Sequence, residues 1–171
     1  MNNPVIGLFG TCGGSKWRDD FIKVYEEKGI PYFNPQVPDW KPEFAVEEAR
    51  HLAEDKVILF PVTDETYGLG SLAEVGFSAL NAIKLNSERD FVVLIDPKPK
   101  PELESNPQLF KESTRMRALV MQHFKRLNMR DLYLVSTLDE MLQVSLVLYD
   151  IALRRNTLSQ FSVLEKKQEG T

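Results

Sequence analysis

Short apolar runs alternate with longer amphipathic stretches along most of this chain. The clearest run covers residues 91–95, Phe-Val-Val-Leu-Ile, and is typical of a strand buried on both faces. Between such runs, apolar residues return with helical spacing, as at Trp17, Phe21 and Tyr25. The pattern predicts strands at residues 4–10, 30–33, 56–62, 91–95 and 132–135, and helices that begin near residues 15, 43, 71, 108 and 137.

Five strands that alternate with helices indicate a parallel sheet with helices on both faces. We therefore predict a single doubly wound α/β domain, flavodoxin- or Rossmann-like, with strand order 2-1-3-4-5. This domain would span residues 1–155, and residues 156–171 would form a polar tail. Pro31 places the second strand at an edge of the sheet. Ligands bind such sheets at the carboxyl ends of the strands, so three loops should face the site: residues 10–15, 34–40 and 63–71.

The helix starts carry further signals. Thr137 and Glu140 have the spacing of a capping box, in which each residue satisfies a free backbone N–H of the other. The second helix, residues 43–55, is expected to turn four small or apolar residues inward: Ala45, Ala49, Leu52 and Ala53.

Composition excludes several classes of protein. The chain has 171 residues, 43% of them hydrophobic, which suits one globular domain. A formal charge of −4 does not suit a protein that binds nucleic acid polymers. The single cysteine, Cys12, excludes a disulfide framework, and two histidines far apart make a zinc site improbable. With no apolar stretch of membrane-spanning length and no signal peptide pattern, we expect a cytoplasmic protein without membrane association.

Ser71 and Glu74 allow two interpretations. Their Ser-x-x-Glu spacing at a predicted helix start is that of a capping box, which would be a structural role. However, Gly68 and Gly70 would let the backbone pass close to a ligand, and Asp64 ends the preceding strand. Two carboxylates that converge on one pocket are what glycosidic chemistry uses, one at the anomeric carbon and one for protons. We expect the helix dipole to keep Glu74 ionised, as a nucleophile requires.

The loop after the first strand is rich in glycine and leads into a helix. Free backbone N–H groups there suit an anion or a sugar hydroxyl. Cys12 could be a nucleophile at the helix N-terminus, although neither histidine is placed as its base. Trp17 belongs to the helix stripe, which favours core packing over contact with a ligand. Arg18 points away from that stripe and is expected to be free to meet an anion or a carboxylate.

Four segments of the first half belong together. They are Phe-Gly-Thr-Cys-Gly-Gly-Ser-Lys-Trp-Arg (9–18), Phe-Asn-Pro-Gln-Val-Pro-Asp-Trp (33–40), Asp-Lys-Val-Ile-Leu-Phe (55–60) and Gly-Leu-Gly-Ser-Leu-Ala-Glu-Val-Gly (68–76). In combination they resemble the nucleoside 2-deoxyribosyltransferase family, in the branch with Trp-Arg and Asn-Pro motifs. The resemblance covers residues 5 to about 95, whereas the second half shares only the strand–helix pattern.

The resemblance implies N-glycosidic bond cleavage or transfer on (deoxy)nucleosides through a covalent glycosyl–glutamate intermediate. It implies that Glu74 is the nucleophile, that Asp64 assists proton transfer, and that Glu48, or as second choice Glu47, holds the sugar. It also implies a homo-oligomer. No metal or organic cofactor is expected, because carboxylates and positioning suffice. Substrate contacts are expected from Gly10, Thr11, Cys12, Gly13, Trp17, Arg18, Asn34, Gly68, Gly70 and Ser71.

Other functions remain open at this point. The loop around Gly13 also resembles that of a deoxynucleoside 5′-monophosphate N-glycosidase, where it would seat the phosphate. The Gly-x-Gly-Ser-x-x-Glu segment at residues 68–74 resembles the phosphoribohydrolases that activate cytokinins. A module of the same fold that binds a nucleotide without turnover is the third possibility. Three carboxylates close to a phosphate would repel it, which favours an enzyme over such a module.

Overall fold

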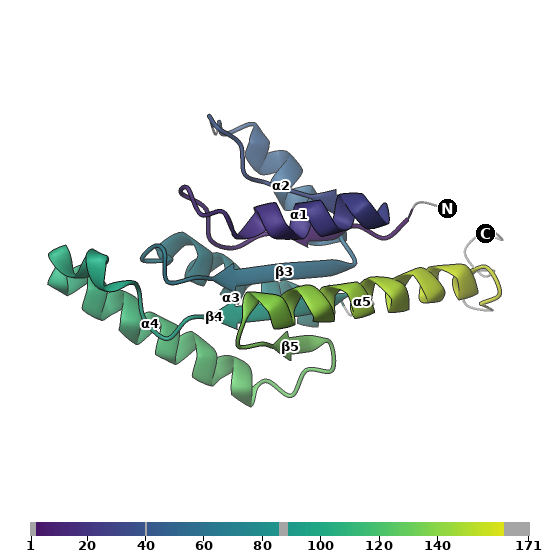
Figure 1. Cartoon of the computed structure of the whole chain (residues 1–171). Helices are drawn as coiled ribbons and strands as arrows, with labels where there is room; N and C mark the ends of the chain where they lie inside the picture. Colours follow the sequence, from purple (N-terminus) through teal and green to yellow (C-terminus); the bar gives the residue numbers. More distant parts are fainter. Residues whose placement is uncertain (1–2, 40, 86–88, 163–171) are drawn as a thin grey trace.

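One parallel sheet organises the molecule (Figure 1). The computed structural model describes residues 3–39, 41–85 and 89–162, and it describes side chains outside residues 79–88. The five strands run in the order β2-β1-β3-β4-β5, all neighbours being parallel, so the predicted α/β fold and strand order are confirmed. The strands are β1 (Ile6–Leu8), β2 (Tyr32–Phe33), β3 (Val57–Val62), β4 (Asp90–Ile95) and β5 (Leu132–Leu134).

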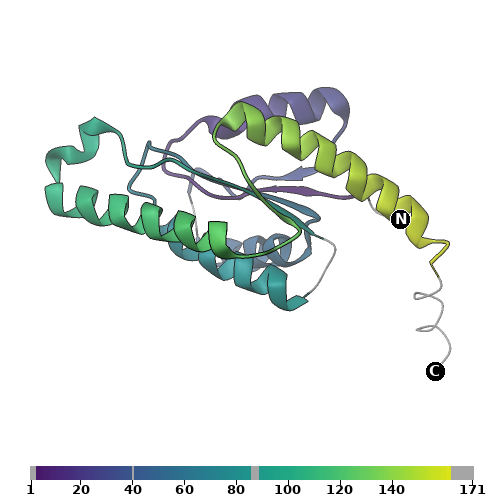
Figure 2. The same ribbon diagram turned by 90° about the horizontal axis from the view of Figure 1, so that it is seen from below.

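Helices cover both faces of the sheet (Figure 2). On one face, α1 (Trp17–Lys28) and α5 (Leu138–Ser159) enclose one apolar core. On the other face lie α2 (Phe44–Glu54), α3 (Leu69–Leu85) and α4 (Pro107–Arg126), and a short 3₁₀ helix, η1 (Pro101–Ser105), precedes α4. Every residue of β3 and β4 is buried, because these central strands are covered on both faces. Strand β2, which follows Pro31, is the edge strand that the proline predicted.

Helix α2 departs from the prediction. None of its residues is buried, and the expected inward face is wrong in three of four positions, because Ala45, Ala49 and Ala53 are exposed. The half-buried residues of α2 are Glu48, His51 and Leu52, which share one face at spacing i, i+3, i+4. Small alanines give a weak apolar signal, and the tertiary contacts of this helix turned two titratable residues inward instead.

The capping predictions have opposite outcomes. At the start of α5, Oγ1 of Thr137 accepts a hydrogen bond from the backbone N–H of Glu140 at 3.1 Å, as predicted. The carboxylate of Glu140 accepts from the backbone N–H of Ser136 at 2.7 Å. Helix α3 begins at Leu69, so Ser71 lies inside the helix and its predicted capping box with Glu74 is wrong. Helix α5 continues to Ser159, past the domain end predicted at residue 155, and residues 163–171 of the predicted tail lie outside the described residues.

Candidate functional site

Glu74 and Glu48, referred to below as the carboxyl pair, come from two helices on the same face of the sheet and interact electrostatically. Glu74 lies on α3 and Glu48 on α2, and both are half-buried. Burial raises the pKa of Glu74 to about 7; the charge of Glu48 adds to the rise and the guanidinium of Arg18 opposes it. A pKa close to neutrality suits a group that exchanges protons or charge with a substrate.

The expectation that the helix dipole keeps Glu74 ionised is wrong. Helix α3 starts at Leu69 and has no acidic residue in its first turn, so Glu74 lies on the second turn. The dipole acts mainly within the first turn, whereas burial and a like charge act directly on this carboxyl. Among the described residues, no hydrogen bond or ion pair to the Glu74 carboxylate is present. The group is thus held in place by its helix and is open to a reaction partner.

Arg18 is not free, contrary to the prediction. Its side chain is 1% exposed and donates hydrogen bonds to backbone oxygens at the end of β1. Nε donates to Leu8 at 2.9 Å, Nη1 to Thr11 at 2.6 Å and Nη2 to Phe9 at 3.2 Å. Burial lowers the pKa of Arg18, and the charges of Glu48 and Glu74 partly offset that effect. Arg18 therefore shapes the loop and supplies a fixed positive charge behind the carboxyl pair.

Hydrogen bonds join the loop after β1 to the end of β3. Thr11 is fully buried; its Oγ1 donates to the carbonyl oxygen of Pro61 at 3.2 Å and accepts from the N–H of Thr63 at 2.9 Å. Thr11 is thus a structural residue whose side chain does not face a ligand. Gly10 is required next to it, because its φ is +88° and a Cβ there would lie 2.3 Å from the Pro61 oxygen. Cys12 and Gly13, by contrast, are exposed at the tip of the loop and remain candidates for substrate contact.

Trp17 belongs to the core, as the helix stripe favoured. It is 5% exposed, and its indole Nε1–H donates to the carbonyl oxygen of Thr11 at 3.0 Å. The guanidinium of Arg18 lies 4.5 Å from the ring centroid, and Phe21 meets the ring edge-on at 5.1 Å. The ring is therefore already occupied and does not offer an open surface on which a base could stack.

Asp64 lies apart from the carboxyl pair. Its carboxylate is 3.6 Å from Nζ of Lys100, and its backbone N–H donates to Oδ2 of Asp96 at 2.7 Å. These groups line a cavity of about 510 Å³ at the carboxyl ends of the strands, which neither Glu48 nor Glu74 lines. The expected convergence of Asp64 with Glu74 is thus not seen, and Glu48 occupies the position of the second carboxyl.

The remaining predicted contacts fall into two groups. Asn34 and Gly68 shape loops: Oδ1 of Asn34 accepts from the N–H of Gln36 at 3.0 Å, and Gly68 is buried with φ +65°. Gly70 and Ser71 lie on the turn of α3 before Glu74. Gly70 is exposed, and a Cβ at this position would have no neighbour within 4 Å; Ser71 is half-buried. Gly70 and Ser71 therefore lie where a ligand of Glu74 could touch them.

Two residues that shape the site escaped sequence reasoning. Glu65 accepts hydrogen bonds from the hydroxyls of Ser15 and Thr63, which joins the loops after β1 and β3. Arg117, fully buried on α4, donates to the carbonyl oxygens of Val62, Asp96, Thr63 and Thr66 and so fixes the loop before α3. No local pattern marks either residue, since Ser15 lies 50 positions from Glu65 and the carbonyl oxygens that Arg117 binds lie 21 to 55 positions from it.

Some classes of site are not found in the described part of the chain. No group of three or more His, Cys, Asp or Glu side chains there could hold a metal ion. None of the described helices combines the length and the apolar character needed to cross a bilayer. The cytoplasmic location and the homo-oligomer stay predictions.

Comparison with known proteins corrects the family assignment. No protein-family model and no curated protein matches the chain. Among solved structures, the chain is similar to the heterodimer of the RPS4 and RRS1 TIR domains, with a TM-score of 0.54 over 86% of this chain and 99% of that chain. Sequence identity is 9%, so the likeness shows the fold alone. The predicted membership in the nucleoside 2-deoxyribosyltransferase family is therefore wrong: the matching fold is that of a TIR domain, and the four motif segments do not establish a family.

Proposed function

We propose that this protein cleaves the N-glycosidic bond of a nucleoside or nucleotide, with Glu74 as the nucleophile. The observation that carries the proposal is the carboxyl pair of Glu74 and Glu48, brought together from two helices beside the glycine-rich loop. Two carboxyls at one site are the minimal equipment for glycosidic chemistry, because one attacks carbon while the other manages a proton.

The reaction proceeds by two displacements. The ionised carboxylate of Glu74 attacks the anomeric carbon; the C–N bond breaks, and its electron pair leaves with the base, which takes a proton from water. Water or a second base then attacks the same carbon, and the ester bond to Glu74 breaks to restore the carboxylate. Hydrolysis results in the first case and transfer in the second, both with retention of configuration.

A 5′-monophosphate is a second candidate substrate, favoured by one observation. Gly13 and Gly14 follow one another with φ of +71° and +90°, and both are exposed just before α1. These two residues form a turn, one of the backbone conformations whose N–H groups can converge on a phosphate. The exposed Lys16 at the start of α1 adds a positive charge there.

The test is a chromatographic assay of the purified protein. Deoxynucleosides, ribonucleosides and their 5′-monophosphates are each incubated with and without a free second base. We expect base release that is lost in Glu74→Gln and kept in Glu112→Gln, which changes an exposed glutamate on α4. A new nucleoside that forms only with the second base indicates a transferase. If no substrate turns over while nucleotide binding persists, the proposal fails and a binding module takes its place.

A further inference from the structure

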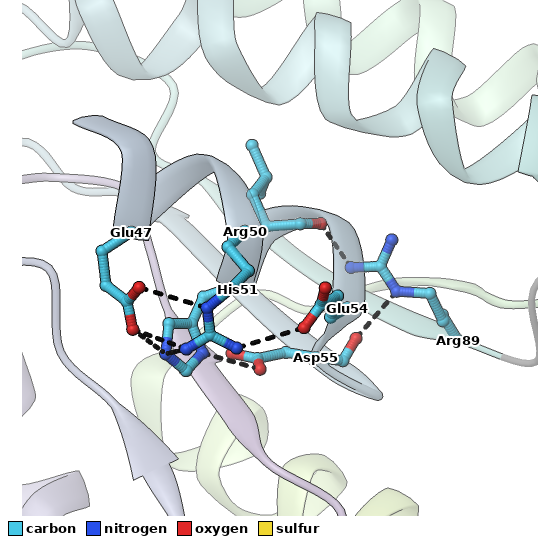
Figure 3. Close-up of polar contacts among 7 residues, drawn as sticks. Glu47, Arg50, His51, Glu54, Asp55 and Arg89 are labelled. Carbon is cyan, nitrogen blue, oxygen red and sulfur yellow. Dashed lines mark hydrogen bonds and ion pairs between the residues drawn. The ribbon is translucent and has the colours of Figure 1, made fainter. Parts of the chain in front are cut away.

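A polar cluster holds the carboxyl-terminal end of α2, the helix that carries Glu48 (Figure 3). His51 donates through Nδ1 to Oδ1 of Asp55 at 2.9 Å. The other ring nitrogen, Nε2, lies 2.9 Å from Nη2 of Arg50 and 3.3 Å from Oε1 of Glu47. Arg89, which stands before β4, donates through Nε to the carbonyl oxygen of Asp55 at 2.8 Å and through Nη2 to that of Leu52.

His51 also joins α2 to the edge of the sheet. Its ring stacks on the ring of Phe33 in β2, with the centroids 3.7 Å apart and the planes 6° apart. Phe33 in turn meets Phe9 at a centroid distance of 5.9 Å. A stacked pair of this kind stabilises the contact beyond the area it buries. One face of the imidazole thus binds β2, while its edge binds the cap of α2.

Ordinary apolar packing contributes little to the placement of α2. Leu52 is its single half-buried apolar residue, and Phe44 and Val46 are 40% and 75% exposed. A cavity of about 350 Å³, lined in part by His51, Asp55 and Lys56, borders the end of the helix. The polar cluster therefore supplies contacts that an apolar interface supplies elsewhere in the fold.

Glu48 shares the inward face of α2 with His51, one turn nearer to the start of the helix. In a parallel β–α–β connection that start lies at the carboxyl ends of the strands, on the side of the candidate site. A helix clamped at one end transmits any tilt to the other end. We propose that His51, held between Asp55 and Phe33, is a positioning residue that fixes α2 so that Glu48 stands beside Glu74.

This proposal concerns the same carboxyl pair as the proposed function. Its test, however, does not require that the protein cleave a glycosidic bond. The readout is the pKa of Glu74, followed by the ¹³C shift of its carboxyl carbon and assigned by comparison with Glu74→Gln. Turnover is not measured, so the two proposals can fail separately.

The variants separate the clamp from general stability. His51→Phe keeps the stacked ring and loses the bond to Asp55, while Phe33→Leu keeps apolar volume and loses the stacking. We expect each to lower the pKa of Glu74 by about one unit, because Glu48 moves away. Asp55→Asn keeps an acceptor for the His51 N–H and should leave the pKa of Glu74 near 7. Glu112→Gln, a change at an exposed glutamate on α4, is the control and should leave it there too.

A double-variant comparison identifies the route. In a Glu48→Gln background, His51→Phe should lower the pKa of Glu74 no further, since the charge that it displaces is already gone. The proposal is overturned if the pKa of Glu74 is unchanged in both His51→Phe and Phe33→Leu. It is also overturned if His51→Phe lowers the pKa of Glu74 as much in the Glu48→Gln background as in the parent. If His51→Phe does not fold, Phe33→Leu alone decides between these outcomes.

Discussion

Replacing Glu74 by glutamine should stabilise the protein, and the gain should depend on pH. The pKa of this carboxyl rises from its ordinary value of 4.5 to about 7, and each unit corresponds to about 1.4 kcal/mol. The full shift is thus worth about 3 kcal/mol, which solvent screening of a half-buried group reduces to about 1–3 kcal/mol.

The sign follows from the direction of the shift. A carboxyl whose pKa is raised by folding favours the folded state while it is protonated, so its contribution is complete below pH 4.5 and is lost as the pH rises through about 7. Glutamine resembles the protonated form at every pH. The variant should therefore exceed the parent by about 1–3 kcal/mol at pH 8 and by less than about 0.5 kcal/mol at pH 4.5.

Thermal unfolding at pH 4.5, 6 and 8, at constant ionic strength, measures this difference. For a chain of this length the expected gain in Tm at pH 8 is about 2–10 °C. Glu112→Gln, at an exposed site on α4, is the control and should show no comparable pH dependence. A Tm difference for Glu74→Gln that is the same at pH 4.5 and pH 8 would refute the reasoning, because a merely structural effect of the amide does not titrate.

Three further outcomes are expected. Glu48→Gln removes the like charge and should lower the pKa of Glu74, visible as a shift of its carboxyl titration toward lower pH; an unchanged midpoint would mean that burial alone sets it. Gly10→Ala forces a Cβ against a backbone oxygen at 2.3 Å and should cost at least about 2 kcal/mol in urea unfolding, whereas Gly70→Ala, in open space within a helix, should be neutral or stabilise by up to about 1 kcal/mol. Equal effects of the two glycine changes would contradict this. Thr137→Ala loses the cap of α5 and should lower the free energy of unfolding by about 1 kcal/mol in the same assay. No change would mean that water replaces Thr137 as the hydrogen-bond partner of the Glu140 N–H.

The fold was predictable because its signals are local. The apolar runs that became β3 and β4 are buried along their whole length, and Pro31 correctly indicated the edge strand. Hydrophobic periodicity predicted the wrong face for α2, whose alanines are exposed, because alanine differs little in hydrophobicity from its polar neighbours. It failed again at Arg18, which was expected to be free, because a charged side chain on a helix predicts solvent unless free backbone oxygens lie within its reach.

The four segments that suggested a family show the limit of motif reasoning. Glycines, an Asn-Pro turn and a Ser-x-x-Glu spacing recur wherever loops end parallel strands, since each has a structural use. Gly10 and Asn34 have such uses in this structure, one beneath a carbonyl oxygen and one in a turn. The motifs therefore mark loops at one edge of the sheet without establishing a family.

The sequence by itself determined the class of the fold, the order of its strands and the loops that meet at one edge, because hydrophobic periodicity and chain connectivity dictate these. Only the tertiary structure decided which carboxyls meet. Glu74 pairs with Glu48 and not with Asp64, and its pKa depends on burial and on charges from α1 and α2. Electrostatic interactions act through space between residues that are distant along the chain, so no local pattern records them.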